Sequence, residues 1–177
     1  MDRCPLPPLR SERLVLEPLV GAHADALWTG LAEPSLYSFV PGDPPADLES
    51  RRARFRRLET RRSPDGSEAW LNWAARLADG SDHVGLVEAT VRPDRSALVA
   101  YFVFVPFARR GYGTEAVRES IRWLVSTGVH RFEARIATRN VASWRLVERL
   151  GFVRVGRLRD GWEKGAPVDD YEYVLSR

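Results

Sequence analysis

The 177-residue sequence predicts an α+β (mixed α/β) fold, in which helices flank a mixed β-sheet. Two observations lead to this prediction. Three apolar segments at 70–77, 84–92 and 97–105 are joined by short turns, which is typical of an antiparallel meander. The third segment is followed by an amphipathic helix and then by a strand at 132–136, and a strand–helix–strand unit places its two strands in parallel.

The other elements follow from hydrophobic periodicity and from the glycines and prolines between them. In chain order we expect a half-buried strand at 10–19, a helix between Gly21 and Glu33, a loop at 36–44, a helix that begins at Pro44–Pro45, the three meander strands, a helix at 115–125, the strand at 132–136, a helix at 140–150, and strands at 152–158 and 170–175 separated by a loop at 159–168. No repeat or linker interrupts this order, so residues 1–177 are expected to form a single domain.

The middle of the chain is its most informative part. Residues 97–105 form an unbroken apolar run, which predicts a strand buried on both faces. Pro106 ends this strand, and Gly111 and Gly113 then precede a helix for which Thr114 is the expected cap.

This glycine loop is a candidate anion site. Backbone N–H groups at a glycine-rich helix start can approach a ligand closely, and the helix dipole adds partial positive charge. Arg109 and Arg110 add full charges beside it, so the expected ligand carries phosphate. The alternative interpretation is a tight strand-to-helix connection with surface arginines.

Composition argues against disulfide-stabilised, metal-binding and membrane-spanning proteins, and it gives no support for nucleic-acid binding. Lys and Arg number 27 against 24 Asp and Glu, and the formal net charge of +3 is too small to indicate nucleic-acid binding. A single cysteine, Cys4, rules out an internal disulfide, and the three histidines lack ligand spacing, so no metal site is expected. With no apolar run of membrane-spanning length and no secretory signal, a cytoplasmic protein without a membrane partner is expected.

The helix expected after Pro45 is strongly basic, with arginines throughout residues 51–62. A basic helix can bind RNA, a membrane surface or an acidic protein. A solvated helix face is the favoured interpretation, because Glu49 and Glu59 dilute the charge and no aromatic platform accompanies it.

A second motif follows in the sequence Asn140-Val-Ala-Ser143. Asn140 is the expected N-cap, and both polar side chains can reach a ligand that passes the helix start; capping alone is the alternative. Together with Gly-Tyr-Gly-Thr-Glu-Ala at 111–116 and Leu-Gly-Phe at 150–152, this motif resembles the GNAT superfamily of acyl-CoA-dependent N-acetyltransferases. It is more narrowly similar to the Rim-type branch, named for enzymes that acetylate the N-termini of ribosomal proteins.

The resemblance implies a GNAT-like twisted sheet whose central parallel strands splay apart. In this family the glycine loop and helix start hold the pyrophosphate of coenzyme A, and the pantetheine arm lies along the central strand. One departure is Ala108, where the family usually has Gln or Arg, and the neighbouring Arg109 can compensate. The residues implied to bind acetyl-CoA are Val103, Phe104, Val105, Arg109, Arg110, Gly111, Tyr112, Gly113, Thr114, Asn140 and Ser143.

The implied reaction is direct attack of an amine on the thioester of acetyl-CoA. It needs a proton acceptor, a donor to the oxyanion and a proton for the departing thiolate. A backbone N–H near Val103 is the expected oxyanion donor, and Ser143 or Tyr101 is expected to protonate the thiolate. Glu88 is the best candidate for the base; a solvated surface carboxylate is the alternative, and ordered water could replace a base altogether.

The acceptor is not identified by the sequence. A protein N-terminus and a small amine both fit, the acyl group is equally open, and a homodimer remains an open alternative to a monomer. Asp169 and Asp170 can attract a cationic amine or pair with Arg157 or Arg159. Two other functions are kept as alternatives: a non-catalytic acyl-CoA-binding module or regulator, and a nucleic-acid-binding protein that uses the arginines of 51–62.

Overall fold

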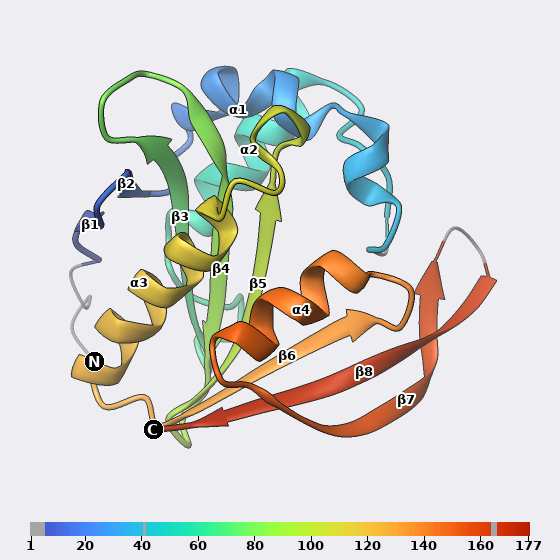
Figure 1. Ribbon diagram of the computed structural model, residues 1–177. Coiled ribbons are helices and arrows are strands. Elements are labelled where there is room, and N and C mark those ends of the chain that lie inside the picture. The colour runs from blue at the N-terminus through green and yellow to red at the C-terminus, as the bar shows by residue number, and fades with distance from the viewer. Residues whose placement is uncertain (1–5, 41, 164–165) are drawn as a thin grey trace.

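The computed structural model describes residues 6–40, 42–163 and 166–177. The strands of these residues form one eight-stranded sheet in the order β1-β2-β3-β4-β5-β6-β8-β7 (Figure 1). The strands are β1 (Leu9–Arg10), β2 (Leu14–Pro18), β3 (Ala69–Leu77), β4 (His83–Val91), β5 (Ser96–Val103), β6 (Arg131–Ala137), β7 (Val153–Glu163) and β8 (Ala166–Ser176). The helices are α1 (His23–Leu31), α2 (Leu48–Leu58), α3 (Tyr112–Ser126) and α4 (Val141–Arg149), with short 3₁₀ helices at Pro34–Tyr37 and Val105–Phe107.

Strand pairing confirms the predicted mixed sheet. From β1 to β5 each strand pairs antiparallel with the next, and β5 then pairs in parallel with β6. β8 lies beside β6, and β7 folds back to form the edge of the sheet. The chain therefore combines an antiparallel meander with a central parallel pair.

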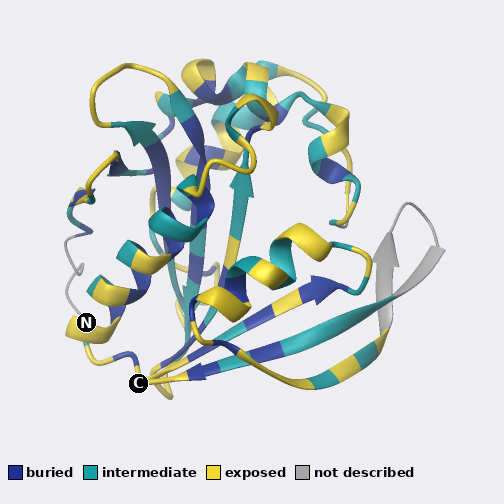
Figure 2. Ribbon diagram, in the orientation of Figure 1, coloured by how far each residue is buried: buried dark blue, intermediate teal, exposed yellow. Residues whose placement is uncertain are grey.

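Helices cover both faces of the sheet. Neighbouring residues of the meander strands point to opposite faces, so each face carries apolar side chains that a helix layer can bury. Trp73 and Val87 belong to a core that includes buried side chains of α3 and α4. Ala74 and Leu86, one position away, belong to a second core shared with α1 and α2. Figure 2 shows this arrangement as buried residues along the central strands beneath helices that are exposed on their outer sides.

The parallel pair is short, and this shapes the rest of the molecule. Strands β5 and β6 pair only where Ser96–Leu98 lies beside Arg131–Glu133. Beyond these residues the two strands diverge, with β5 and β6 running in clearly different directions in Figure 1. The splayed pair that the resemblance implied is therefore present.

Two predicted boundaries at the start of the chain are wrong. The strand expected at 10–19 is divided into β1 and β2 by a turn in which Ser11 N–H donates to the Leu14 carbonyl at 3.0 Å. It is also not half-buried, because Val15 is as inaccessible as its neighbours. Helix α2 begins at Leu48 instead of the prolines, because the side chain of Asp47 caps it by accepting from Ser50 N–H at 2.6 Å.

Two later predictions also need correction. The loop expected at 159–168 is largely a continuation of β7 and β8, which pair as far as Glu163 and Ala166; residues 164–165 of this loop lie outside the described residues. The strand expected at 97–105 ends at Val103 and is not buried on both faces, since Ala100 is exposed. The divergence of β6 leaves this part of β5 without a neighbour on one side.

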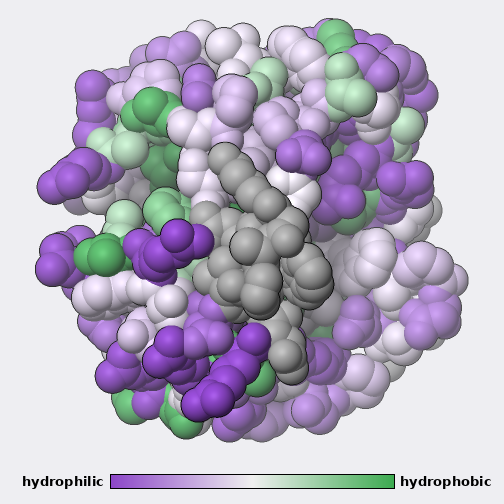
Figure 3. Space-filling model, turned by 90° about the vertical axis from the view of Figure 1, so that its right-hand side faces the viewer, coloured by the Kyte–Doolittle hydropathy of each residue, from purple (hydrophilic) through white to green (hydrophobic). Residues whose placement is uncertain are grey.

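One face of the molecule is largely polar, as expected when the apolar side chains are buried between the sheet and its helices. Hydrophilic side chains cover most of the face shown in Figure 3, and hydrophobic ones gather there only in small groups. Among the described residues, no helix combines the length and the apolar character needed to cross a membrane.

Gly85 on β4 allows the meander to pack closely beside the point of divergence. A Cβ atom at this position would lie 1.9 Å from the carbonyl oxygen of Phe102 on β5. We therefore expect Gly85→Ala to lower the free energy of unfolding by about 1–3 kcal/mol, as overpacking of a well-packed site does. Urea denaturation measures this change, with Gly80→Ala as control, because its Cβ would meet nothing closer than 4.0 Å. Equal stabilities of the two variants would contradict the prediction.

Candidate active site

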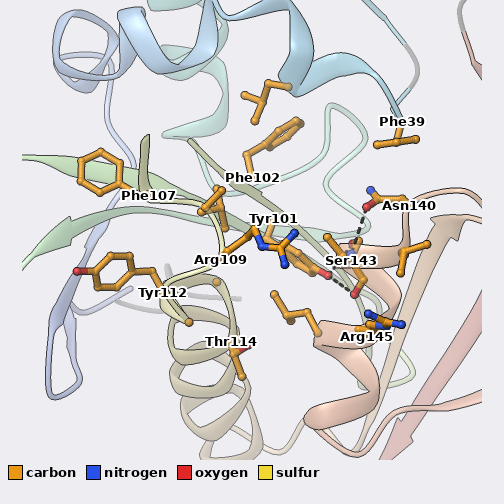
Figure 4. A pocket seen from close by; sticks show the side chains of 18 of the residues that line it. Phe39, Tyr101, Phe102, Phe107, Arg109, Tyr112, Thr114, Asn140, Ser143 and Arg145 are labelled. Atoms are coloured by element: carbon orange, nitrogen blue, oxygen red, sulfur yellow. Dashed lines mark hydrogen bonds between the residues drawn. The ribbon is translucent and has the colours of Figure 1, made fainter. Parts of the chain in front are cut away.

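A cavity of about 650 Å³ lies where β5 and β6 diverge, a volume typical of ligand sites (Figure 4). Four segments line it: the loop after α1, the end of β5, the glycine loop with the start of α3, and the start of α4. The lining residues include Leu36, Phe39, Val40, Tyr101, Phe102, Val103, Phe107, Ala108, Arg109, Gly111, Tyr112, Gly113, Thr114, Arg139, Asn140, Ser143, Arg145 and Arg149. Tyr101 and Phe102 are adjacent on β5 and point to opposite faces, so the cavity reaches both faces of the sheet.

The glycine loop has the geometry of an anion-binding helix start. Gly111 precedes α3 with φ of +84°, a left-handed conformation that glycine adopts without strain. Thr114 lies within the first helical turn, so its predicted role as the cap is wrong. The first N–H groups of a helix have no intrahelical acceptor. The backbone N–H groups of Tyr112, Gly113 and Thr114, which line the cavity, are therefore free of intrahelical acceptors and can donate to a ligand.

An ion pair from the N-terminal part of the chain fixes this loop. Arg13, in the turn between β1 and β2, donates from Nε to Glu115 Oε2 at 2.7 Å, and its backbone N–H donates to Oε1 at 2.8 Å. Arg13 Nη1 also donates to the carbonyl of Arg110 at 3.1 Å, and its guanidinium lies 4.7 Å from the Tyr112 ring centroid. Burial disfavours the charge of Glu115, but its bonds to Arg13 and Ser11 outweigh this effect and lower its pKa.

Sequence reasoning missed both members of this pair. They are 102 positions apart, and only the adjacency of Glu115 to the glycine motif gave a signal. The contacts show that Arg13 positions the loop through its backbone and through Tyr112.

The second motif lies opposite the glycine loop, as Figure 4 shows. Asn140 accepts from Ser143 N–H at 3.1 Å, so its predicted capping of α4 is confirmed. Ser143 Oγ lies 2.7 Å from the hydroxyl of Tyr101, which also donates to the Ser143 carbonyl at 2.9 Å. Burial raises the pKa of Tyr101 to about 12, although the hydrogen bond to Ser143 opposes the shift. The structure thus brings together two side chains that are distant in sequence.

Three residues implied to bind the cofactor lie outside the cavity lining. Arg110 is exposed, and its carbonyl accepts from Arg13. Phe104 is buried, and its N–H donates to the Val84 carbonyl at 2.8 Å. Val105 is exposed in the 3₁₀ helix that follows β5.

Glu88 is not a freely solvated surface carboxylate, because it is partly buried between β4 and the helices of one face. It lies on β4 opposite Ala100 and on the same face as Leu86, which packs against α1 and α2. Burial raises its pKa, and the charges of Arg54 and Arg51 act in the opposite direction. Glu88 therefore lies beside the open part of β5, on the face opposite the Tyr101 side chain.

Other charged groups that could have served the site are paired. Arg157 forms an ion pair with Asp169, which is one of the two roles expected for that carboxylate. On α2, Arg52 lies 3.0 Å from Asp25 and 2.6 Å from Glu49. Part of the basic helix is therefore a solvated, ion-paired surface.

The structure brings together two of the histidines that the sequence left scattered. His23 Nε2 and His83 Nε2 lie 3.5 Å and 3.3 Å from Glu17 Oε2, and the ligand atoms of the three residues lie within 4.8 Å of one another. However, Val20 N–H donates to His23 Nδ1 at 3.1 Å, so the neutral ring carries its proton on Nε2 and directs it at Glu17. Arg76 Nε occupies the other carboxylate oxygen at 2.9 Å. Both carboxylate oxygens of Glu17 therefore have partners within the protein.

Comparison with known proteins agrees with this geometry. Residues 13–153 match the family model of the acetyltransferase (GNAT) domain. The chain is 23% identical over 173 residues to the uncharacterized N-acetyltransferase YoaA of Bacillus subtilis, covering 96% of both chains.

Solved structures that share the fold include two ribosomal-protein acetyltransferases. One is RimL, a ribosomal L7/L12 α-N-protein acetyltransferase in complex with coenzyme A, with a TM-score of 0.84, 17% identity and 97% of each chain covered. The other is the ribosomal-protein-S5-alanine acetyltransferase from Vibrio fischeri, with a TM-score of 0.82, 18% identity and 96% of each chain covered.

The pair of Arg13 and Glu115 has a testable pH dependence. The folded-state pKa of Glu115 lies below its ordinary value of 4.5, so the pair stabilises the fold above that pH and is lost as pH falls through the lowered pKa. We expect Glu115→Gln to lower the free energy of unfolding by about 1–2 kcal/mol at pH 7, with the difference from wild type shrinking below about pH 4. Urea denaturation at several pH values measures this.

The matched control is Glu119→Gln on the same helix, because Glu119 lies 3.4 Å from the largely exposed Arg122 and such surface pairs contribute about 0–1 kcal/mol. A destabilisation by Glu115→Gln that is the same at every pH would contradict the assignment.

Proposed function

Because this chain belongs to the acetyltransferase (GNAT) family and is an acyl-CoA-dependent acetyltransferase, we propose that it transfers the acetyl group of acetyl-CoA to a primary amine. The amine attacks the thioester directly. The observation that carries this proposal is the cavity at the divergence of β5 and β6, which presents a helix N-terminus on one face and Phe39 with Phe102 on the other. Membership of the family favours this enzyme over a non-catalytic acyl-CoA-binding module.

The proposed cofactor site is the half of the cavity between α3 and α4. Pyrophosphate is held by the N–H groups after Gly111 and by the positive charge of Arg109 and Arg145, which line the cavity from the glycine loop and from α4. The pantetheine arm lies along the open edge of β5 near Val103 and beside Asn140. Its amide groups supply the hydrogen bonds that a neighbouring strand would otherwise make.

The proposed chemistry divides between the two faces of the sheet. The amine approaches from the face that carries Glu88, which accepts its proton directly or through water. A backbone N–H near Val103 stabilises the oxyanion. On the other face Tyr101, whose phenol is protonated at neutral pH, supplies the proton to the departing thiolate. Ser143, at 2.7 Å, can then pass a proton to Tyr101 while it takes one up from solvent.

The glycine loop gives the first test. Gly111→Val places a β-branched residue in a left-handed conformation, at a cost of at least about 1–2 kcal/mol, and disturbs the N–H groups proposed to hold pyrophosphate. We expect at least a tenfold loss of coenzyme A affinity by calorimetry.

The matched control is Gly128→Val, at the other end of α3, where φ is +93° and a Cβ meets an arginine nitrogen at 3.3 Å, the same distance as at Gly111. This variant should lose similar stability and keep its affinity. Unchanged affinity in Gly111→Val would remove the loop from the cofactor site.

Tyr101 gives the second test. Tyr101→Phe keeps the ring and removes the proposed proton donor, so kcat should fall by about 10²–10⁴-fold, the usual contribution of acid catalysis, with the KM for acetyl-CoA little changed. Initial rates with a free-thiol reagent measure both parameters. Because the pKa of Tyr101 is about 12, wild-type kcat should show no alkaline decline from this group up to pH 10. Full kcat in Tyr101→Phe would assign the proton to another donor.

A further inference from the structure

Two arginines of α2 lie beside Glu88 and have no role in the proposed reaction. Arg51 and Arg54 are three residues apart, so they share one face of the helix. Both lie close enough to Glu88 for their charges to act on it. The three residues, called here the arginine–glutamate cluster, lie on the α1–α2 face, from which the amine is proposed to approach.

A chain of contacts connects Arg51 to the cavity. Arg51 Nη2 lies 3.5 Å from the hydroxyl of Tyr37, and the guanidinium carbon lies 5.7 Å from the Phe55 ring centroid. The Tyr37 hydroxyl donates a hydrogen bond to the Leu31 carbonyl at 2.9 Å, and the Tyr37 ring centroid lies 6.0 Å from that of Phe102. Phe102 lines the cavity, so Arg51 lies one aromatic ring behind the cavity wall.

The positive charge of this cluster is incompletely balanced. Arg52 and Arg56, on the same helix, pair with carboxylates within 4.0 Å. Within the described part of the chain, no such ion pair joins Arg51 or Arg54 to Glu88 or to another carboxylate. Arg51 Nε is in addition buried without a hydrogen-bond partner, and a buried donor of a charged group that is left unsatisfied costs stability.

We propose that Arg51, with Arg54, binds an anionic group on the acceptor, a carboxylate or a phosphate near the reacting amine. The guanidinium of arginine forms paired, charge-assisted hydrogen bonds with carboxylate and phosphate oxygens. An anion bound by the terminal nitrogens of these arginines balances the second positive charge. Glu88 remains available to accept the proton of the amine. This inference rests on the proposed function and narrows its substrate to amines that carry a neighbouring negative charge.

The buried Nε distinguishes this proposal from RNA binding by the same helix. A nucleic acid would contact the exposed arginines of α2 along its outer surface. Arg51 is instead half-buried, with its guanidinium held against Tyr37 and Phe55.

Matched acceptors test the proposal. We would measure acetyl transfer to the tetrapeptide amides Ala-Asp-Ala-Ala and Ala-Asn-Ala-Ala, and to O-phosphoethanolamine and ethanolamine. The peptide pair tests carboxylate and the second pair tests phosphate. We expect kcat/KM to be about tenfold higher for the anionic member of at least one pair, which is the effect of one charge-assisted contact of about 1.4 kcal/mol.

Variants locate the effect. Arg51→Ala should reduce the preference to about one, and Arg51→Lys should weaken it while keeping the charge and the fold. Arg57→Ala, which removes an exposed arginine from the same helix, should retain the full preference. Equal kcat/KM within both pairs, or an undiminished preference in Arg51→Lys and Arg51→Ala, would overturn the proposal.

Failure here is separable from failure of the proposed function. Calorimetry of the same peptides in saturating coenzyme A measures acceptor binding without turnover. If coenzyme A binds and neutral amines are acetylated without any anionic preference, only the present inference is wrong. If the folded protein binds no coenzyme A and acetylates none of the four acceptors, the proposed function itself is wrong.

Discussion

The short pairing of β5 with β6 is the constraint on which the rest of the site depends. The strands share hydrogen bonds only at Ser96–Leu98, and the sheet is open beyond that point. Buried backbone groups require hydrogen-bond partners, so the exposed edge of β5 is suited to a ligand that itself carries amide groups. The helix starts of α3 and α4 and the loop after α1 converge on this opening, and their side chains form the wall of the cavity.

The position of the glycine loop depends on a contact that spans most of the chain. Arg13 connects the turn between β1 and β2 to Glu115 and to the Arg110 carbonyl. The N-terminal hairpin is thus part of the support of the site, although none of its residues lines the cavity at the divergence of β5 and β6.

Local patterns predicted most of the fold, and residues that meet only in three dimensions escaped prediction. Apolar runs with short turns were sufficient for the meander, and helical periodicity with capping residues was sufficient for α3 and α4. The apolar run at 97–105 was assigned full burial because nothing in it indicates that β6 diverges and leaves Ala100 exposed. The hydrogen bond of Tyr101 with Ser143, and the cluster of Glu88 with Arg51, depend on how strands and helices cross, and single-sequence periodicity carries no information on that.

The opening of the cavity on both faces of the sheet also has a consequence for the kinetic mechanism, that is, for the order in which the two substrates bind. Donor and acceptor that approach from opposite sides do not compete for space, so a ternary complex can form before any bond is broken. Transfer within such a complex needs no acylated enzyme intermediate. Double-reciprocal plots for the two substrates would then intersect, as in a sequential mechanism, and either substrate could bind first.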